Sequence, residues 1–178
     1  MDKPMSNLSF RGMSWLIKLR DIYRPRENIL AEAGIKPGFQ VLDYGCGPGS
    51  YVFAAAPLVG ESGRIYALDI HPVAVKRVGN IAARKRLTNI ETILSDCATG
   101  LPDKSMDIVL LYDILHLLAN PDEVLAELYR VLCTEGILSF NDHHLKDENG
   151  IITRITGKGL FTLSKKGKRV YNFLKVAR

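Results

Sequence analysis

The sequence is poor in cysteine and contains no long hydrophobic run. Its three cysteines, Cys46, Cys97 and Cys133, are odd in number and far apart, which fits reduced thiols better than a disulfide framework or a zinc site. The longest apolar stretches, near 108–111 and 114–118, fall far short of the roughly 20 residues that a membrane-spanning helix requires. Because the N-terminal residues also lack the apolar core of a signal peptide, we expect a cytoplasmic protein without a membrane span.

Acidic residues are absent from the C-terminal end of the sequence. Residues 149–178 hold 8 basic residues and no acid, whereas the rest of the chain has 16 basic residues against 19 acidic ones. A basic end can attract an anionic substrate, a nucleic acid or a membrane surface. Lysines that protect the edge of a β-sheet would explain the same composition, and we favour this second interpretation.

The order of apolar segments predicts the fold class. The chain has 178 residues, 47% of them hydrophobic, which is enough for one compact domain. Short apolar runs between turn residues predict buried strands at 39–43, 63–69, 90–95, 106–112 and 136–140. Helical patterns lie between strands, at 51–58, 73–85 and 122–132. Regular alternation of strand and helix indicates an α/β fold with a doubly wound, mainly parallel sheet.

Two outer segments extend this core. An amphipathic stretch at 13–33 predicts a helical cap within residues 1–34, ahead of a main domain at 35–178. At the other end, 161–164 and 169–176 flank a Lys-Lys-Gly-Lys turn. This pattern predicts an antiparallel hairpin that completes a seven-stranded sheet.

A glycine cluster follows the first predicted strand, where doubly wound sheets bind their ligands. Gly45, Gly47 and Gly49 let the backbone turn tightly and approach a ligand closely. Asp43, at the entrance to this loop, would repel a phosphate but suits an ammonium group. The spacing differs from the dinucleotide pattern G-x-G-x-x-G, and no Gly-Lys-Ser/Thr follows, which excludes a P-loop. These features favour a nucleoside ligand that lacks phosphates.

Two further carboxylates end the second and third predicted strands. Asp69 can accept hydrogen bonds from both ribose hydroxyls of an adenosine. Asp96 can accept from an adenine amino group, with Ile70 and Cys97 against the ring. Each carboxylate alone could simply cap a loop, but with Asp43 they form a coherent site for adenosine and an amino acid.

The segment from about 40 to 140 resembles the class I S-adenosylmethionine-dependent methyltransferases, in particular the ubiquinone/menaquinone-biosynthesis and "type 11" group. The matching segments are VLDYGCGPG at 41–49, IYALDI at 65–70, SDCATGL at 95–101, LYDILHLL at 111–118 and LYRVLCTEG at 128–136. The resemblance implies a Rossmann-like fold and S-adenosylmethionine as the cofactor. It covers somewhat over half the chain and is specific for the cofactor, but not for the methyl acceptor.

The resemblance also implies roles for individual residues. Asp43 and Gly45 would hold the methionine part of the cofactor, and Tyr112 would lie beneath it. The remaining cofactor-binding residues would be Cys46, Gly47, Gly49, Asp69, Ile70, Asp96 and Cys97. The sequence departs from the family in the Leu-Cys-Thr-Glu-Gly turn at 132–136 and in a short region after 140, so we expect the N-terminal helix to supply a lid.

Catalytic residues are harder to predict, because methyl transfer depends chiefly on alignment and needs a protein base only for some acceptors. The candidates at the carboxyl ends of the fourth and fifth strands are His143, Tyr112 and His116. A packed, structural imidazole is the competing interpretation for His116. Asp142, His143 and His144 could suggest a metal site, but adjacent side chains usually point apart, so we expect no metal.

A small-molecule acceptor, which could be anionic, is the leading hypothesis. A nucleic-acid or protein methyltransferase is the alternative suggested by the basic end, although the fourth strand lacks the Asp/Asn-Pro-Pro-Tyr element of amino-methylating nucleic-acid enzymes. An NAD(P)-binding oxidoreductase and a non-catalytic, cofactor-binding partner subunit are competing hypotheses.

Overall fold

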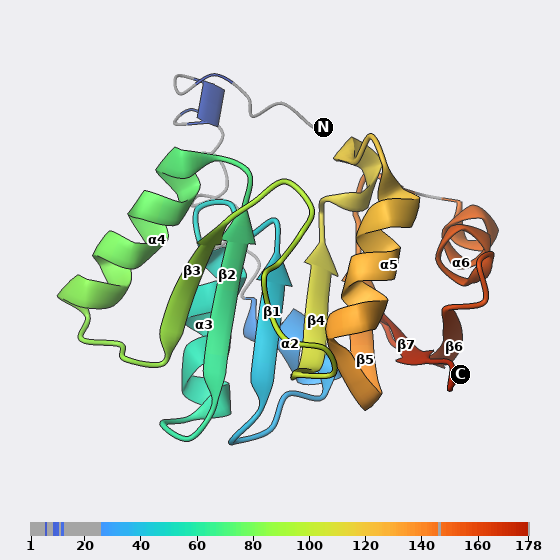
Figure 1. Ribbon diagram of the computed structural model, residues 1–178, viewed down its shortest axis with the longest axis horizontal. Coiled ribbons are helices and arrows are strands. Elements are labelled where there is room, and N and C mark those ends of the chain that lie inside the picture. The colour runs from blue at the N-terminus through green and yellow to red at the C-terminus, as the bar shows by residue number, and fades with distance from the viewer. Residues whose placement is uncertain (1–5, 7–8, 11, 13–25, 146, 178) are drawn as a thin grey trace.

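The sheet at the centre of the molecule has seven strands. The computed structural model describes residues 6, 9–10, 12, 26–145 and 147–177. The strands lie in the order β3-β2-β1-β4-β5-β7-β6, as Figure 1 shows. They are β1 (Gln40–Tyr44), β2 (Arg64–Asp69), β3 (Ile90–Leu94), β4 (Met106–Tyr112), β5 (Leu132–Asn141), β6 (Phe161–Lys166) and β7 (Tyr171–Lys175). The predicted mainly parallel, seven-stranded Rossmann-like sheet is confirmed.

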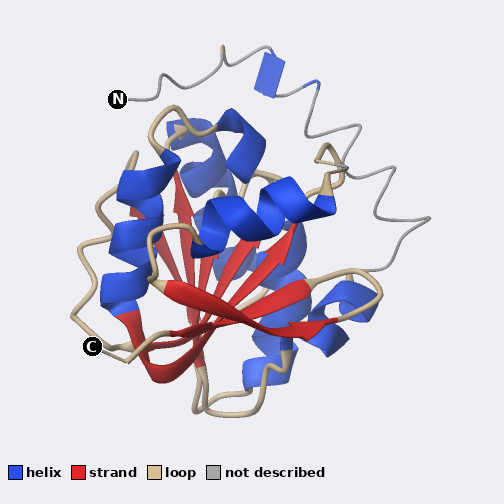
Figure 2. Cartoon of the chain, turned by 90° about the vertical axis from the view of Figure 1, so that its right-hand side faces the viewer, coloured by secondary structure: helices blue, strands red, loops and turns tan. Residues whose placement is uncertain are grey.

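Helices cover both faces of the sheet (Figures 1 and 2). One face packs against α2 (Glu27–Ala33), α3 (Ser50–Val59) and α4 (Pro72–Arg84). The other packs against α5 (Pro121–Val131) and α6 (Glu148–Thr156). Each layer buries its own apolar cluster, so the sheet lies between two hydrophobic cores. In the described part of the chain, no helix combines the length and the apolar character needed to cross a bilayer.

The strand order reverses at β1. This strand pairs in parallel with β2 on one side and with β4 on the other. The chain therefore leaves β1 and β4 in neighbouring positions at the same edge of the sheet. This is the topological switch point at which open α/β sheets bind ligands.

The C-terminal hairpin is confirmed, with β7 antiparallel to both β5 and β6. Phe140 of β5 lies opposite Tyr171 of β7. The turn that joins β6 to β7 therefore lies at the carboxyl end of β5, on the same edge of the sheet as the glycine loop.

The structure differs from the sequence predictions in three elements. No helix joins β3 to β4; a loop spans 95–105 instead, so the predicted regular alternation is wrong at this connection. The strand predicted at 136–140 begins at Leu132, because a bulge after Leu132 absorbs the residues expected to form a turn. Helix α6 was not predicted; its Asn-Gly start is typical of a turn, but burial of Ile151 and Ile155 stabilises the helix.

The predicted N-terminal helix lies mostly outside the described residues, which include only its end, α2. Leu30 and Ala33 of α2 are buried against α3 in the same core as the sheet. The proposed cap and lid role of residues 1–34 stays a prediction.

Candidate active site

The glycine loop between β1 and α3 is anchored to the end of β2. The backbone N–H groups of Gly45 and Cys46 both donate to the carbonyl of Leu68, at 2.9 and 2.8 Å. Gly45, Gly47 and Gly49 have φ angles of 81, 51 and 91°, in the left-handed region that favours glycine. The loop therefore holds its shape through backbone hydrogen bonds and through residues without a Cβ.

The three glycines have different surroundings. A Cβ at Gly45 would lie 2.9 Å from the Ile114 side chain, and a Cβ at Gly49 would lie 2.7 Å from Phe53. A Cβ at Gly47 would meet nothing within 4 Å. Close packing within the protein thus explains Gly45 and Gly49, whereas Gly47 faces open space that a ligand can fill.

Cys46, at the centre of the loop, is buried. Its thiol lies 3.9 Å from the carbonyl oxygen of Gly47, and burial raises its pKa well above the ordinary value. The side chain is therefore a neutral, packed thiol beneath the loop.

Asp43, the last buried acid before the loop, lacks a partner for one of its oxygens. The residue is 2% exposed, and within the described part of the chain its Oδ2 atom accepts no hydrogen bond. Burial, and secondarily the charge of Asp69, raises the pKa of Asp43 to about 7. Because a buried carboxylate oxygen without a partner is costly, this side chain favours a cationic group beside the loop.

Asp69, at the end of β2, connects the glycine loop to the start of α4. Its Oδ2 accepts from the backbone N–H of Gly47 and its Oδ1 from that of His71, each at 2.8 Å. Burial raises its pKa, and these two hydrogen bonds partly oppose the shift. The side chain caps two loops here, and each of its oxygens retains acceptor capacity for a ligand hydroxyl.

An aromatic contact covers the chain just after Asp69. The ring of Phe10, a residue that is 2% exposed, stacks on His71 with ring centroids 4.4 Å apart. His71 in turn accepts a hydrogen bond from the N–H of Val73 through Nδ1 and so caps α4. Ile70, between Asp69 and His71, is half-buried.

The loop after β3 carries Asp96 and Cys97, both half-buried. The hydroxyl of Tyr44, in the glycine-loop segment, donates to the carbonyl of Asp96 at 3.2 Å. The N–H of Cys97 donates to the Ser95 hydroxyl at 3.3 Å. The structure therefore brings the predicted adenine-contacting residues next to the glycine loop.

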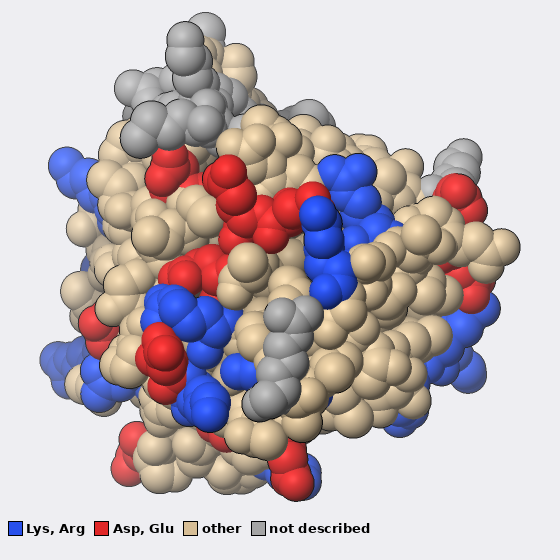
Figure 3. Space-filling model, turned by 45° about the vertical axis from the view of Figure 1, so that its right-hand side comes forward, with Lys and Arg blue, Asp and Glu red and all other residues tan. Residues whose placement is uncertain are grey.

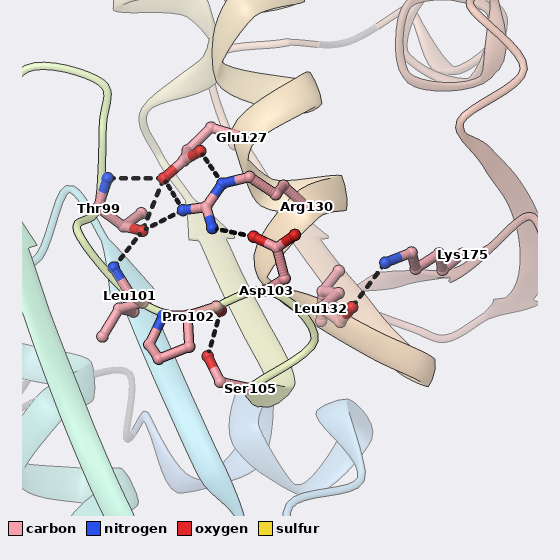
Figure 4. A network of polar contacts seen from close by, with 9 residues as sticks. All are labelled: Thr99, Leu101, Pro102, Asp103, Ser105, Glu127, Arg130, Leu132 and Lys175. Atoms are coloured by element: carbon pink, nitrogen blue, oxygen red, sulfur yellow. Dashed lines mark hydrogen bonds and ion pairs between the residues drawn. The ribbon is translucent and has the colours of Figure 1, made fainter.

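A polar network that the sequence did not reveal fixes this loop to α5 (Figure 4). Glu127 accepts from both the N–H and the hydroxyl of Thr99, each at 2.7 Å. Arg130 donates to Glu127 at 2.8 Å and to Asp103 at 2.5 Å. The hydrogen bond from Arg130 is the largest cause, and together with those from Thr99 it lowers the pKa of Glu127 to about 2. The three-residue spacing of Glu127 and Arg130 on a predicted helix was the signal available in the sequence.

Tyr112, at the end of β4, is buried and does not have a free hydroxyl. Its OH is 2.8 Å from the hydroxyl of Ser139, and its ring packs edge-on against Tyr51 with centroids 4.7 Å apart. Burial raises its pKa. Arg26, 6% exposed, donates to the Tyr51 hydroxyl at 3.0 Å, so this cation is engaged behind the site rather than in it.

Two aspartate–histidine pairs cross between the loops that follow β4 and β5. Asp142, after β5, is 2.8 Å from Nδ1 of His116, which lies in the 3-10 helix η1 (Leu115–Leu117) after β4. Conversely Asp113, after β4, is 2.6 Å from Nδ1 of His143, after β5. The Asp142 side chain is 0% exposed and that of His116 21%, whereas the His143 side chain is 47% exposed. The crossed pairs hold the two loops together.

The ring of His144 contacts both neighbouring imidazoles. Its centroid is 3.9 Å from that of His143 and 4.4 Å from that of His116. The expectation that the adjacent histidines point apart is therefore wrong. Even so, across the described ranges no three metal-ligating side chains are placed to share an ion.

Known proteins share this arrangement of strands and loops. A protein-family profile described as a methyltransferase domain matches residues 35–177. The chain belongs to the class I S-adenosylmethionine-dependent methyltransferases. A methyltransferase from Aquifex aeolicus, described as SAM dependent, has a similar structure, with a TM-score of 0.73 and 25% identity over 89% of this chain and 96% of that chain.

Curated relatives of this methyltransferase chain match over part of their length. The aklanonic acid methyltransferase DauC of Streptomyces sp. (strain C5) is 36% identical over 58% of this chain and 47% of its own. The ubiquinone/menaquinone biosynthesis C-methyltransferase UbiE of Hydrogenovibrio crunogenus is 39% identical over 60% of this chain and 42% of its own. The chain thus spans less than half the length of these two relatives.

The residues of this methyltransferase fit the methyl donor of the family, S-adenosylmethionine. The unpartnered, buried oxygen of Asp43 suits a cationic amino-acid group, and the open space at Gly47 admits a ligand close to the backbone. The Asp43 carboxylate would repel a phosphate in the same place.

Proposed function

We propose that this chain transfers the methyl group of S-adenosylmethionine to a small-molecule acceptor, with His116 as the base, held by Asp142. The observation that carries the proposal is the 2.8 Å contact between the buried Asp142 carboxylate and Nδ1 of His116 at the switch-point edge of the sheet. Since an ionised carboxylate can only accept, Nδ1 donates and Nε2 keeps its lone pair for an acceptor proton.

The cofactor-binding roles divide along the strand ends. Asp43 binds the amino-acid ammonium, and Gly45, Cys46, Gly47 and Gly49 shape the loop that approaches the methionine part. Asp69 accepts from the ribose, with Ile70, Asp96 and Cys97 around the adenine. The cofactor supplies a methyl group activated by a positively charged sulfur. The task of the chain is then to hold the acceptor aligned with that group and to remove a proton where the acceptor carries one.

Tyr112 supports the site from below in this proposal. Its hydroxyl is hydrogen-bonded to Ser139 and its ring is buried, so it contributes packing and does not take a proton. His143 is the second candidate base; its greater exposure and its pairing with Asp113 suit a role in orienting the acceptor.

The names of several relatives support a small acceptor. They include aklanonic acid methyltransferase, ubiquinone/menaquinone biosynthesis C-methyltransferase and trans-aconitate 2-methyltransferase. Each name refers to a small molecule, and two of the three refer to an acid.

A ribosomal RNA acceptor is the second candidate function. The ribosomal RNA large subunit methyltransferase E of Methanocaldococcus jannaschii is 35% identical over 43% of this chain. Figure 3, however, shows acidic and basic side chains interspersed over the face that it displays. Ion pairs such as Arg130–Asp103 and Lys158–Asp122 likewise place acidic side chains beside basic ones, whereas an RNA-binding face usually carries a continuous basic patch.

The proposed activity can be tested by following S-adenosylhomocysteine release from the purified protein with a metabolite pool and, separately, with ribosomal RNA. We expect release with the metabolite pool only. Release with RNA alone would favour the second candidate, and tight NAD binding without a response to S-adenosylhomocysteine would indicate an oxidoreductase. Binding of S-adenosylhomocysteine with no turnover of either pool would favour a non-catalytic subunit.

The base can be tested with His116→Asn and His143→Asn, compared on the acceptor identified in that screen. We expect His116→Asn to lower kcat by roughly 10²- to 10⁴-fold while leaving S-adenosylhomocysteine affinity unchanged. His143→Asn should act mainly on the KM of the acceptor. An unchanged kcat in His116→Asn would contradict the assignment of the base.

A further inference from the structure

A cavity of about 240 Å³ lies beyond the carboxyl end of β5, between α6 and the turn that joins β6 to β7. Its apolar wall includes Phe140, Leu145 and Ile151. Phe140 and Ile151 are buried, at 0 and 6% exposure. The volume is enough for a ring-sized apolar group but is small for a whole cofactor.

Three of the five charged residues that line this cavity are basic, and the other two are Asp142 and Glu148. Lys166, Lys168 and Arg169 line it from the β6–β7 turn, and they belong to the C-terminal region that contains no acid. Lys166 forms an exposed ion pair with Glu148 at 2.5 Å, whereas Arg169 pairs with the half-buried Glu32 at 3.6 Å. An exposed pair such as Lys166–Glu148 contributes little, about 0–1 kcal/mol, so an anion can compete for Lys166.

The cavity also reaches the carboxylate that holds the proposed base. Asp142, which holds His116, is one of its lining residues. Adjacent strands are about 4.8 Å apart, so the end of β5 is roughly 10 Å from the glycine loop after β1, with the end of β4 between them. A molecule that fills the cavity and extends toward β4 would therefore bring a reactive atom beside His116.

We propose that this cavity binds the acidic group and part of the apolar body of the methyl acceptor, which is therefore a small carboxylic acid. The inference rests on the proposed methyl transfer. The β6–β7 turn supplies the cations, the wall formed by β5 and α6 supplies the apolar contact, and Asp142 marks the end of the cavity nearest the reaction. The lysines at this turn thus serve a ligand as well as the edge of the sheet.

The inference can be tested by binding alone, without knowledge of the natural acceptor. Matched pairs of ring-bearing carboxylates and their amides, such as 3-phenylpropionate and 3-phenylpropionamide, are titrated by NMR into protein with and without saturating S-adenosylhomocysteine. Phenyl phosphate is titrated in parallel to separate a carboxylate from a phosphate site. We expect the carboxylates to bind at least about tenfold more tightly than the amides. Because Asp142 and Glu148 also line the cavity, a doubly charged phosphate should be repelled more than a carboxylate and bind less tightly.

Variants in and next to the β6–β7 turn test whether the acids bind in this cavity. The double variant Lys166→Gln/Lys168→Gln should lose the preference for acids, whereas Lys165→Gln, an exposed lysine of the same strand that does not line the cavity, should keep it. Glu148→Gln should tighten acid binding severalfold, because it removes a competing carboxylate.

Three results would overturn the inference: equal binding of acids and amides, tighter binding of phenyl phosphate than of the carboxylates, or an acid preference that survives in the double variant. S-adenosylhomocysteine affinity is measured in the same samples. If the wild-type protein does not bind S-adenosylhomocysteine, the proposed function itself is contradicted. This outcome is distinguishable from a loss of acid preference.

Discussion

At the residue scale, Asp43 can be either protonated or ionised near neutral pH. Burial and the nearby Asp69 raise its pKa to about 7 in the ligand-free protein, while a cationic ligand requires the ionised form. S-adenosylmethionine binding should therefore weaken by about tenfold for each pH unit below 7 and level off above it. Calorimetric titration between pH 5.5 and 7.5 measures this dependence. A flat profile in the wild-type protein would contradict the ligand role of Asp43, whereas Asp43→Asn should bind weakly and without this dependence.

The same carboxylate should destabilise the ligand-free fold. The folded state raises its pKa from 3.8 to about 7, so stability is greatest below the unfolded value and is lost as pH rises toward 7. At pH 8 Asp43→Asn should therefore raise the free energy of unfolding, by on the order of 2–4 kcal/mol, and at pH 4 it should give little gain. Thermal denaturation at the two pH values tests this prediction; a destabilised variant at pH 8 would refute it.

Replacement of Gly47 should affect ligand affinity more than the stability of the fold. Gly47→Ala and the control Gly34→Ala place a Cβ at similar positive φ angles of 51 and 81°, with no atom closer than 4.0 Å. Both should cost about 1 kcal/mol of stability through backbone strain. Only Gly47→Ala should weaken S-adenosylhomocysteine binding, by about tenfold or more, since its methyl group enters the ligand space. Equal affinities for the two variants would show that the loop approaches no ligand at Gly47.

At the scale of elements, the loop between β3 and β4 depends on α5 for its position. It has no helix of its own, and the Glu127–Arg130 network supplies the contacts that fix Thr99 and Asp103. The fold lowers the pKa of Glu127 from 4.5 to about 2. The ionised Glu127 side chain therefore stabilises the fold above pH 4.5, and this stabilisation is lost as pH falls toward 2.

Glu127→Gln should therefore lower stability by about 2 kcal/mol at pH 7 and by much less near pH 2. Because the loop carries Asp96 and Cys97, S-adenosylhomocysteine affinity should fall as well, with kcat at saturating cofactor nearly unchanged. Glu123→Gln, on the same helix but outside the network, is the matched control. If both variants bind the ligand equally well, the network does not position the adenine side of the site.

Elements were predictable from the sequence where one local pattern decided them. The strands β1, β2 and β4 are apolar runs buried on both faces, and the hairpin has a clear turn, so their positions were predicted correctly. Helix α6 was missed because Ile151 and Ile155 stabilise it only once they contact distant strands. The start of β5 was misplaced because a bulge depends on pairing with β4, which no local segment encodes.

For the whole molecule, cofactor binding should stabilise the fold by mass action. S-adenosylhomocysteine at about 100 times its Kd should add roughly 2.7 kcal/mol to the free energy of unfolding. For a chain of 178 residues this corresponds to a Tm increase of roughly 5–10 °C. NAD at the same concentration should leave Tm unchanged. A Tm increase with NAD alone would favour the dinucleotide interpretation.

The candidate site was predictable only on its cofactor side. The glycine loop, Asp69 and Asp96 each lie at the end of a strand, and parallel strands bring such ends to one edge. The acceptor side depends on which side chains meet across loops. Spacing alone could not show that Asp142 pairs with His116 rather than with its neighbour His143, or that Tyr112 is closed off by Ser139.

The crossed aspartate–histidine pairs have an evolutionary consequence. Each pair has one member in the loop after β4 and the other in the loop after β5, so a change in either loop alone removes a hydrogen-bond partner from a side chain of the other. Relatives that adopt a different acceptor should therefore exchange residues 113 and 143, and residues 116 and 142, as coordinated double substitutions. Divergence of substrate preference in this lineage would proceed in paired steps, and the two loops would be inherited as one unit.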